Sequence, residues 1–169
     1  MSVAIQLDDL LDYSDHERRK WRDWLMADPA RLKISLQPSG RFRTVQALLD
    51  HVFLVERRHL CRLEGSTPPE STGVADGDMA ALFEYADLVR KDFRSYLDQL
   101  DAAEAAAMMT VSSPALGHYT VQRWKLATHM VLHEIRHLAQ LALAARIAGH
   151  APPGEHDFFF YPGAAVRQA

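Results

Sequence analysis

The stretch TVQRWKLATHMVLHEIRHLAQLALAARIAG, residues 120–149, decides the fold. Its apolar residues recur every three or four positions, which is the pattern of a helix that buries one face. We therefore predict a helix from about Thr120 to Ala148 that stops at Gly149. Its most apolar run, residues 138–149, contains Gln140 and an arginine and is far shorter than the roughly 20 residues that cross a bilayer. No membrane segment is expected.

Clusters of proline and glycine divide the preceding sequence into three further helical segments. We predict them over residues 8–27, 45–64 and about 78–100. Asp28-Pro29 ends the first, because the residue before proline avoids the helical conformation. Thr44 is a suitable N-cap for the second and Gly65 a suitable terminator, and Asp76 or Asp78 can cap the third. The alanine-rich continuation, residues 101–110, is interpreted as helical or frayed.

No segment shows a convincing period-two strand pattern, and residues 112–117 are interpreted as a loop. The fold class is therefore all-α. Four helices of roughly 20 to 29 residues are most simply buried as a four-helix bundle, in a single domain over residues 1–169. A short aromatic segment, residues 158–161, is expected to pack back on the helices.

Composition and length argue against three classes of protein: nucleic-acid-binding proteins, two-domain enzymes and secreted disulfide-bonded proteins. The 169 residues carry a formal charge of −3, so there is no large positive field for a nucleic acid. The length suits one domain and argues against separate cofactor and substrate domains. A single cysteine, Cys61, cannot form an internal disulfide, and the first residues are acidic where a secretory signal would be basic. A cytoplasmic protein is expected, with Cys61 as a packing thiol.

Three histidines at four-residue intervals carry the chemistry of the last helix. His133 and His137 lie about 40° apart at 100° per residue, on the apolar face, whereas His129 lies towards its edge. An i, i+4 pair of imidazoles can share one metal ion, and a third ligand must then come from another helix. The second helix offers His51 and His59 among apolar residues, and spacing alone leaves both open.

Two other interpretations compete with a metal site. Each histidine could be an ordinary core residue bonded to a nearby carbonyl or hydroxyl, in a purely structural or interaction bundle. The string HEIRH, residues 133–137, also fits the H-E-x-x-H pattern of zinc proteases, in which Glu134 would activate water. The chain continues without the glycine and third histidine of one protease class, and the nearest downstream candidate, Glu155, lies in a proline-rich loop. The protease is therefore the weaker interpretation.

Two strings resemble a known family. LLDHVFLVERRHL in the second helix and HMVLHEIRHLAQLALAARIAG in the fourth are similar to the signatures of the DinB-like family of metal-binding four-helix bundles, and HDFFFY resembles its ending. The resemblance implies an up-down-down-up bundle with a divalent metal held by His51, His133 and His137, which decides between His51 and His59. Arg136 stands where the family often has histidine, and Ala139 where it often has glycine before Gln140.

The resemblance also implies a function. Characterised relatives include thiol-dependent transferases and isomerases that use low-molecular-weight thiols, and some hydrolases. A thiol-dependent S-transferase acting on a small molecule is the favoured expectation, and a non-catalytic metal- or ligand-binding stress or sensor bundle is the alternative. The metal could be zinc, nickel, iron or manganese, since imidazole suits several divalent ions. Three imidazoles leave an open coordination position, as in catalytic sites.

The roles of the remaining polar residues are less specific. Glu134 could be a general base or a partner of the ligands, and the alternative is an exposed or interhelical pair with an arginine. Glu56 has the same two interpretations. Arg136 and the ERRK run, residues 17–20, are expected on the solvated surface. Core or dimer-contact roles are expected for the tryptophans Trp21, Trp24 and Trp124, and a homodimer is expected because small bundles often self-associate.

Overall fold

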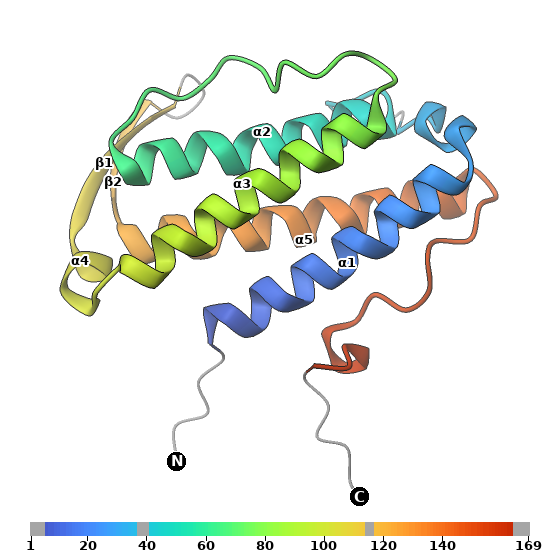
Figure 1. Ribbon diagram of the computed structural model, residues 1–169. Helices are drawn as coiled ribbons and strands as arrows, with labels where there is room; N and C mark the ends of the chain where they lie inside the picture. The colour runs from blue at the N-terminus through green and yellow to red at the C-terminus, as the bar shows by residue number, and fades with distance from the viewer. Residues whose placement is uncertain (1–5, 37–40, 114–116, 164–169) are drawn as a thin grey trace, which may run out of the picture. The chain divides into compact units, whose positions relative to one another are not determined.

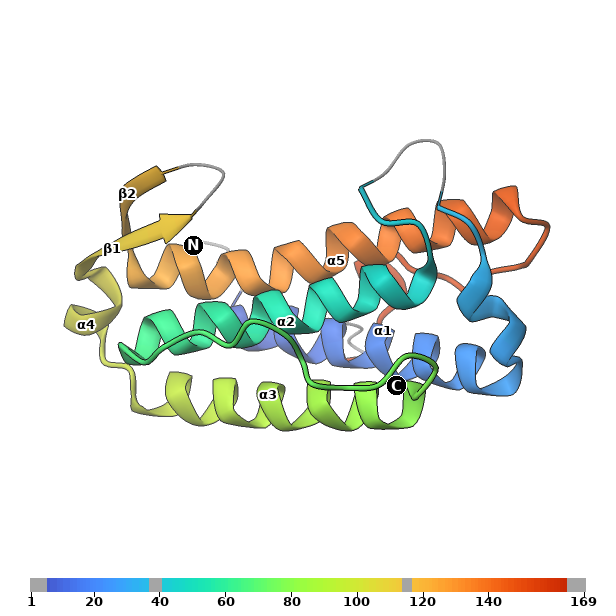
Figure 2. The same ribbon diagram turned by 90° about the horizontal axis from the view of Figure 1, so that it is seen from above.

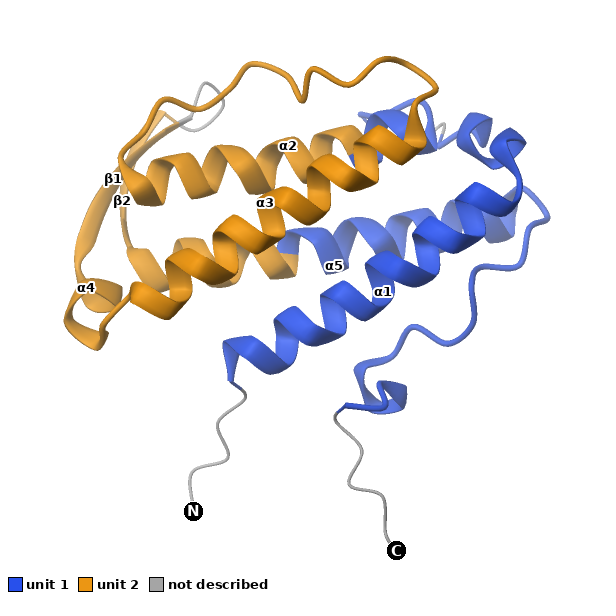
Figure 3. Cartoon of the chain, viewed as in Figure 1, with its two compact units in different colours: residues 1–49, 133–169 blue, residues 50–132 orange. Residues whose placement is uncertain are grey.

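The computed structural model describes residues 6–36, 41–113 and 117–163. The chain divides into two compact units, residues 1–49 with 133–169 and residues 50–132 (Figure 3). Two long helices, α2 (Val45–Glu64) and α5 (Arg123–Ile147), contribute residues to both units. The single domain expected from the sequence stays a prediction.

The first unit is built on α1 (Leu7–Ala27), which is followed by the 3-10 helix η1 (Pro29–Lys33) (Figure 1). Asp28 ends α1 in an extended conformation and its carboxylate caps η1, as the Asp28-Pro29 pair predicts. The second half of α5 and the short 3-10 helix η2 (Phe158–Phe160) complete the unit. Its fully buried side chains include Leu11, Trp21, Leu25 and Leu141.

The second unit holds α3 (Met79–Gln99) side by side with the longer part of α2, as Figures 1 and 2 both show. The rings of Phe53 and Phe83 join the two helices, with centroids 5.6 Å apart. The short helix α4 (Ala102–Ala106) and the strands β1 (Met108–Ser113) and β2 (Gly117–Gln122) lead into the first turns of α5. Asp78 caps α3 by accepting a hydrogen bond from the Ala81 N–H.

Glycine ends both long helices that run through the two units. Gly65 after α2 has φ +74° and Gly149 after α5 has φ +81°. In each case the amide of the glycine and the amide after it bond back to the last turn, as in a Schellman motif. The predicted bounds of α2 and its Thr44 cap are confirmed, since Thr44 Oγ1 accepts from the Ala47 N–H.

The hairpin corrects the sequence interpretation of residues 101–122. Helix α3 does not continue, and α4 is a separate helix with its own cap, Asp101. Residues 108–113 pair antiparallel with residues 117–122, and α5 begins at Arg123 instead of Thr120. Val111 is 1% exposed, so the hairpin buries part of one strand, but the opposite strand is largely exposed and gives no alternating pattern.

The other expectations about the fold concern burial. Within the described ranges, no helix is both long and apolar enough to cross a membrane. Cys61 is buried, as expected of a packing thiol. The aromatic segment packs on α1 through edge contacts of Phe158 and Tyr161 with Tyr13, while Phe159 and Phe160 stay exposed. Trp21 is buried and Trp124 is 44% exposed.

Candidate metal centre

His133 and His137 face each other across one turn of α5. Both are 7% exposed, and their ring centroids are 4.4 Å apart. Their Nε2 atoms are separated by 3.1 Å. Two nitrogens bound to one zinc ion at about 2.0 to 2.1 Å in tetrahedral geometry are about 3.3 Å apart. The pair is therefore already close to the spacing that a shared metal ion requires.

Gln140 fixes the protonation of His137. The Nδ1 atom of His137 lies 2.6 Å from the side-chain oxygen of Gln140, and because that oxygen only accepts, Nδ1 carries the proton. The lone pair of a neutral ring is then on Nε2, the atom that faces His133. Burial lowers the pKa of His137, the Gln140 bond opposes this, and the charge of Arg136 lowers the pKa further. Both effects that lower the pKa favour the neutral form, which is the one that binds metal.

His51 is the third member of the group. One ring nitrogen from each of His51, His133 and His137 lies within 4.8 Å of the others. Three neutral imidazole nitrogens at this separation are a donor set that suits a divalent transition metal. Two of the three rings are buried and one is partly exposed. The residues therefore fit a divalent ion, which is the kind of site that the pair on α5 and the resemblance of the sequence led us to expect.

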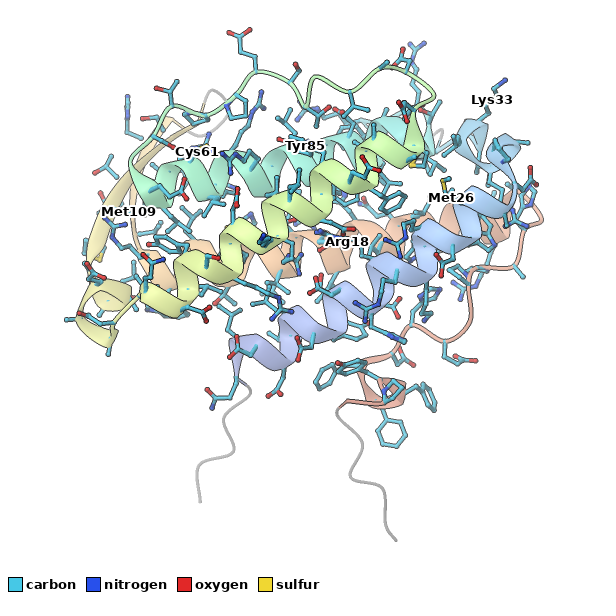
Figure 4. The ribbon with its side chains drawn as sticks, viewed as in Figure 1. Arg18, Met26, Lys33, Cys61, Tyr85 and Met109 are labelled. Carbon is cyan, nitrogen blue, oxygen red and sulfur yellow. The ribbon has the colours of Figure 1, made fainter. Side chains whose placement is uncertain are left out.

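Glu134, next to His133, is held by two residues of α1. Arg18 reaches its two carboxylate oxygens at 2.9 Å from Nε and 3.0 Å from Nη2, and Ser14 Oγ donates to it at 2.5 Å. Figure 4 labels Arg18 on α1. The side chains of Arg18 and Glu134 are 4% and 1% exposed. This is the pair with an arginine that the sequence offered as the alternative for Glu134, in a buried form.

The burial of Arg18 corrects the expectation for residues 17–20. Glu17 and Arg18 are each 3% exposed, so the first half of this run is buried, whereas Arg19 is exposed as expected. Arg18 faces Glu134, and Glu17 bonds to the imidazole of His156 in the segment after α5. Lys20 is a local partner of Glu17, with Nζ 2.7 Å from Oε1, but Glu134 and His156 lie more than 110 residues away in sequence from the residues that they pair with. The burial of these charges therefore depends on tertiary contacts.

The second unit contains an equivalent buried pair and the two other histidines considered in the sequence, His59 and His129. Glu56 accepts from Arg90 Nε at 2.6 Å, with side chains 3% and 5% exposed, so it is an ion-pair partner inside the unit and not on its surface. The rings of His59 and His129 meet edge to face with centroids 5.5 Å apart. Burial lowers the pKa of His59 to about 3, and the charge of Arg62 acts in the same direction.

Comparison with protein families gives the same family as the resemblance of the two helical strings. The model of the DinB family matches residues 1–165, which is nearly the whole chain. The chain belongs to the DinB family. A comparison with curated proteins finds no significant match.

One solved structure supports the fold of this DinB-family chain. It is that of YfiT from Bacillus subtilis, which is described as "a probable metal-dependent hydrolase with an unusual four-helix bundle topology". The two chains share 14% sequence identity with a TM-score of 0.69, over 89% of this chain and 92% of the other. This similarity shows the fold, and the predicted four-helix bundle is confirmed.

Sequence reasoning missed four residues around the histidines. Gln140 follows His137 by three positions on one helix, so its contact with the ring could have been anticipated from helical spacing. Ser14 and Arg18 are four residues apart on α1, but no local pattern connects them to Glu134. Phe42 lies before α2 and its ring meets that of His137 edge to face, with centroids 6.1 Å apart. A long-range contact of this kind has no signal in the sequence.

Proposed function

We propose that this DinB-family protein is a divalent-metal-dependent enzyme that acts on a small molecule, with His51, His133 and His137 as the metal ligands. The observation that carries the proposal is the group of three ring nitrogens within 4.8 Å of one another. When bound, a divalent ion would supply a Lewis acid that favours the deprotonated, nucleophilic form of a thiol or of water. The description of YfiT as a probable metal-dependent hydrolase supports the same class of chemistry.

The residues of this chain supply the preorganisation. Gln140 holds the His137 ring in one tautomer, with Nε2 available for the ion. The Arg18 and Ser14 bonds to Glu134 fix the turn of α5 on which His133 lies. Phe42 covers an edge of the His137 ring with an apolar surface. Because these contacts already hold the histidine side chains in place, less side-chain entropy is lost when a metal ion binds.

Within this class, we favour a thiol-dependent S-transferase over a hydrolase. Imidazole ligands suit ions such as zinc that bind thiolates well, and three protein ligands leave room for a thiol. The geometry offers little for a water-activating general base, because the Glu134 oxygens already accept bonds from Arg18 and Ser14. For the same reason the protease interpretation is not favoured, since its glutamate must take a proton from water.

The first experiment tests the metal centre. Zinc, nickel, iron or manganese is added to chelator-treated protein, and bound metal is measured by elemental analysis after desalting. One ion per chain is expected for the wild type and for His59→Ala, with at least tenfold weaker binding for His51→Ala, His133→Ala and His137→Ala. Equal binding by all five proteins would exclude this centre.

The second experiment separates the candidate activities. The metal-loaded protein is incubated with an aryl halide electrophile with and without 2-mercaptoethanol, and in parallel with an aryl ester. A transferase gives a thioether and released halide only with the thiol present, whereas a hydrolase cleaves the ester without it. A metal-binding sensor binds the ion and turns over neither probe. His133→Ala must abolish whichever activity is found. The homodimer and the cytoplasmic location stay predictions from the sequence.

A further inference from the structure

The connection between α1 and α2 has an unusual charge for this chain. Residues 29–45, PARLKISLQPSGRFRTV, contain four basic residues and no acidic one, although the whole chain has a net charge of −3. Arg31 is engaged locally, since it bonds to the Trp24 carbonyl and stacks on the Trp24 ring. Lys33 projects from η1 (Figure 4). The remaining two, Arg41 and Arg43, are exposed and flank Phe42.

Phe42 connects this basic segment to the metal centre. Its ring contacts the ring of His137 at a centroid distance of 6.1 Å, and the guanidinium carbon of Arg41 lies 5.6 Å from the centroid of Phe42. The two distances in series place the Arg41 charge at most about 12 Å from the centroid of the His137 ring, well within the Debye length of about 30 Å at 0.01 M salt. The charge therefore acts on a ligand that approaches the ring.

A third arginine adds to the same field. Arg136 precedes His137 on α5 and is exposed, as the sequence predicts. Since the two residues are adjacent on one helix, the Arg136 charge lies at the exposed side of the turn that carries the buried His137 ring. Glu134 is the only acidic residue between residues 133 and 147, and its carboxylate is paired with Arg18. The positive charge beside the histidine pair is therefore not balanced by an exposed acid of this helix segment.

We propose that the substrate of this centre is a small anion, bearing a carboxylate or a phosphate, which Arg41, Arg43 and Arg136 attract to the histidines. The inference rests on the proposed function, because it assigns a substrate class to the same centre. A positive field around a site raises the local concentration and the association rate of anions, and salt weakens it. The apolar ring of Phe42 would contact the uncharged part of such a molecule.

The test compares two thiols of equal length and opposite charge, 3-mercaptopropionate and cysteamine, by calorimetric titration of the zinc-loaded protein. Since the thiols differ in acidity, the readout is the change in the ratio of their dissociation constants on substitution. At about 10 Å in water a unit charge alters the binding of a singly charged ligand about twofold. Arg41→Gln, Arg43→Gln and Arg136→Gln should each shift the ratio about fourfold against the anion at low salt, and much less at 0.5 M salt.

Matched variants complete the design. Arg41→Lys keeps the charge and should keep the ratio, and Arg19→Gln, on the exposed side of α1, should leave it unchanged. A ratio that is the same in the wild type and in the three glutamine variants would overturn the inference.

A separate arm keeps the two proposals distinguishable. Inorganic phosphate is titrated into metal-free and zinc-loaded protein, so that anion binding is measured without a thiol. Phosphate binding that weakens in the Arg41→Gln and Arg136→Gln variants supports the anion site even if zinc or the thiols fail to bind, which would refute the proposed function alone. Zinc binding with no effect of the three arginines on phosphate or thiols would refute the anion site alone.

Discussion

Replacing Arg18 with methionine tests how much the buried ion pair with Glu134 contributes to stability. The two side chains are 4% and 1% exposed, and the guanidinium reaches the carboxylate at 2.9 and 3.0 Å. Methionine fills a similar volume but leaves the carboxylate buried without its cation. Breaking such a pair costs about 3 to 5 kcal/mol. Because Ser14 still donates to Glu134, we expect the free energy of unfolding to fall by about 3 kcal/mol.

The assay is urea unfolding at pH 7, followed by circular dichroism in the presence of a chelator. Arg57→Met is the control, because Arg57 also lies 2.9 Å from a carboxylate, that of Asp92, but the side chains are 32% and 53% exposed. Its expected cost is about 0 to 1 kcal/mol. The double variant Arg18→Met, Glu134→Leu removes both members of the ion pair and should recover most of the loss. If Arg18→Met costs no more than Arg57→Met, the reasoning is refuted.

Three further outcomes are expected. Burial lowers the pKa of His59 to about 3 from about 6.5, so between these two pH values the unfolded chain binds a proton at His59 and the folded chain does not. The free energy of unfolding is therefore unaffected by His59 above about pH 6.5 and should fall by about 2 kcal/mol at pH 5. Urea unfolding should show a smaller loss for His59→Gln, and an equal loss would contradict this assignment. Zinc at 100 times its dissociation constant should add about 2.7 kcal/mol of stability, measured by the same method, and none in His133→Ala. Gly149→Ala, at φ +81°, should cost about 1 kcal/mol, and no measurable cost would mean that the helix end rearranges.

The helices were predictable from the sequence because their signals are local. Residues 45–64 show the apolar period, a threonine cap and a terminal glycine, and α2 has these bounds. The hairpin was not predictable, because its strands pair with each other and only Val111 is deeply buried among its described side chains. The described side chains of β1 alternate between exposed and less exposed, but a single buried residue is too short an apolar pattern to recognise in the sequence.

The histidine pair could be predicted for the same reason as the helices. His133 and His137 lie on one helix, so their spacing alone brings the rings together. The third ligand lies on a different helix from the pair, and spacing does not show which residue of α2 faces them. His51 and His59 were therefore equal candidates, and the resemblance to the DinB family decided for His51. One ring nitrogen of His51 lies within 4.8 Å of those of the pair, and its role as a ligand stays a prediction. Phe42 had no comparable signal, because its contact with His137 depends on how the connection before α2 folds.

Buried charges show most clearly where sequence reasoning stops. Glu17 and Arg18 were expected on the surface, and a surface ion pair was one of the interpretations of Glu56 and Glu134. All four are at most 3% exposed. A charge is buried only when a partner satisfies it, and the partner of Glu134 lies 116 residues away. This pairing also changes the meaning of a motif. In H-E-x-x-H the glutamate must be able to accept a proton from water, whereas here an arginine and a serine bind that carboxylate. The same five letters therefore describe two proposed metal ligands and a structural anion, and only the contacts of Glu134 distinguish this case from a protease.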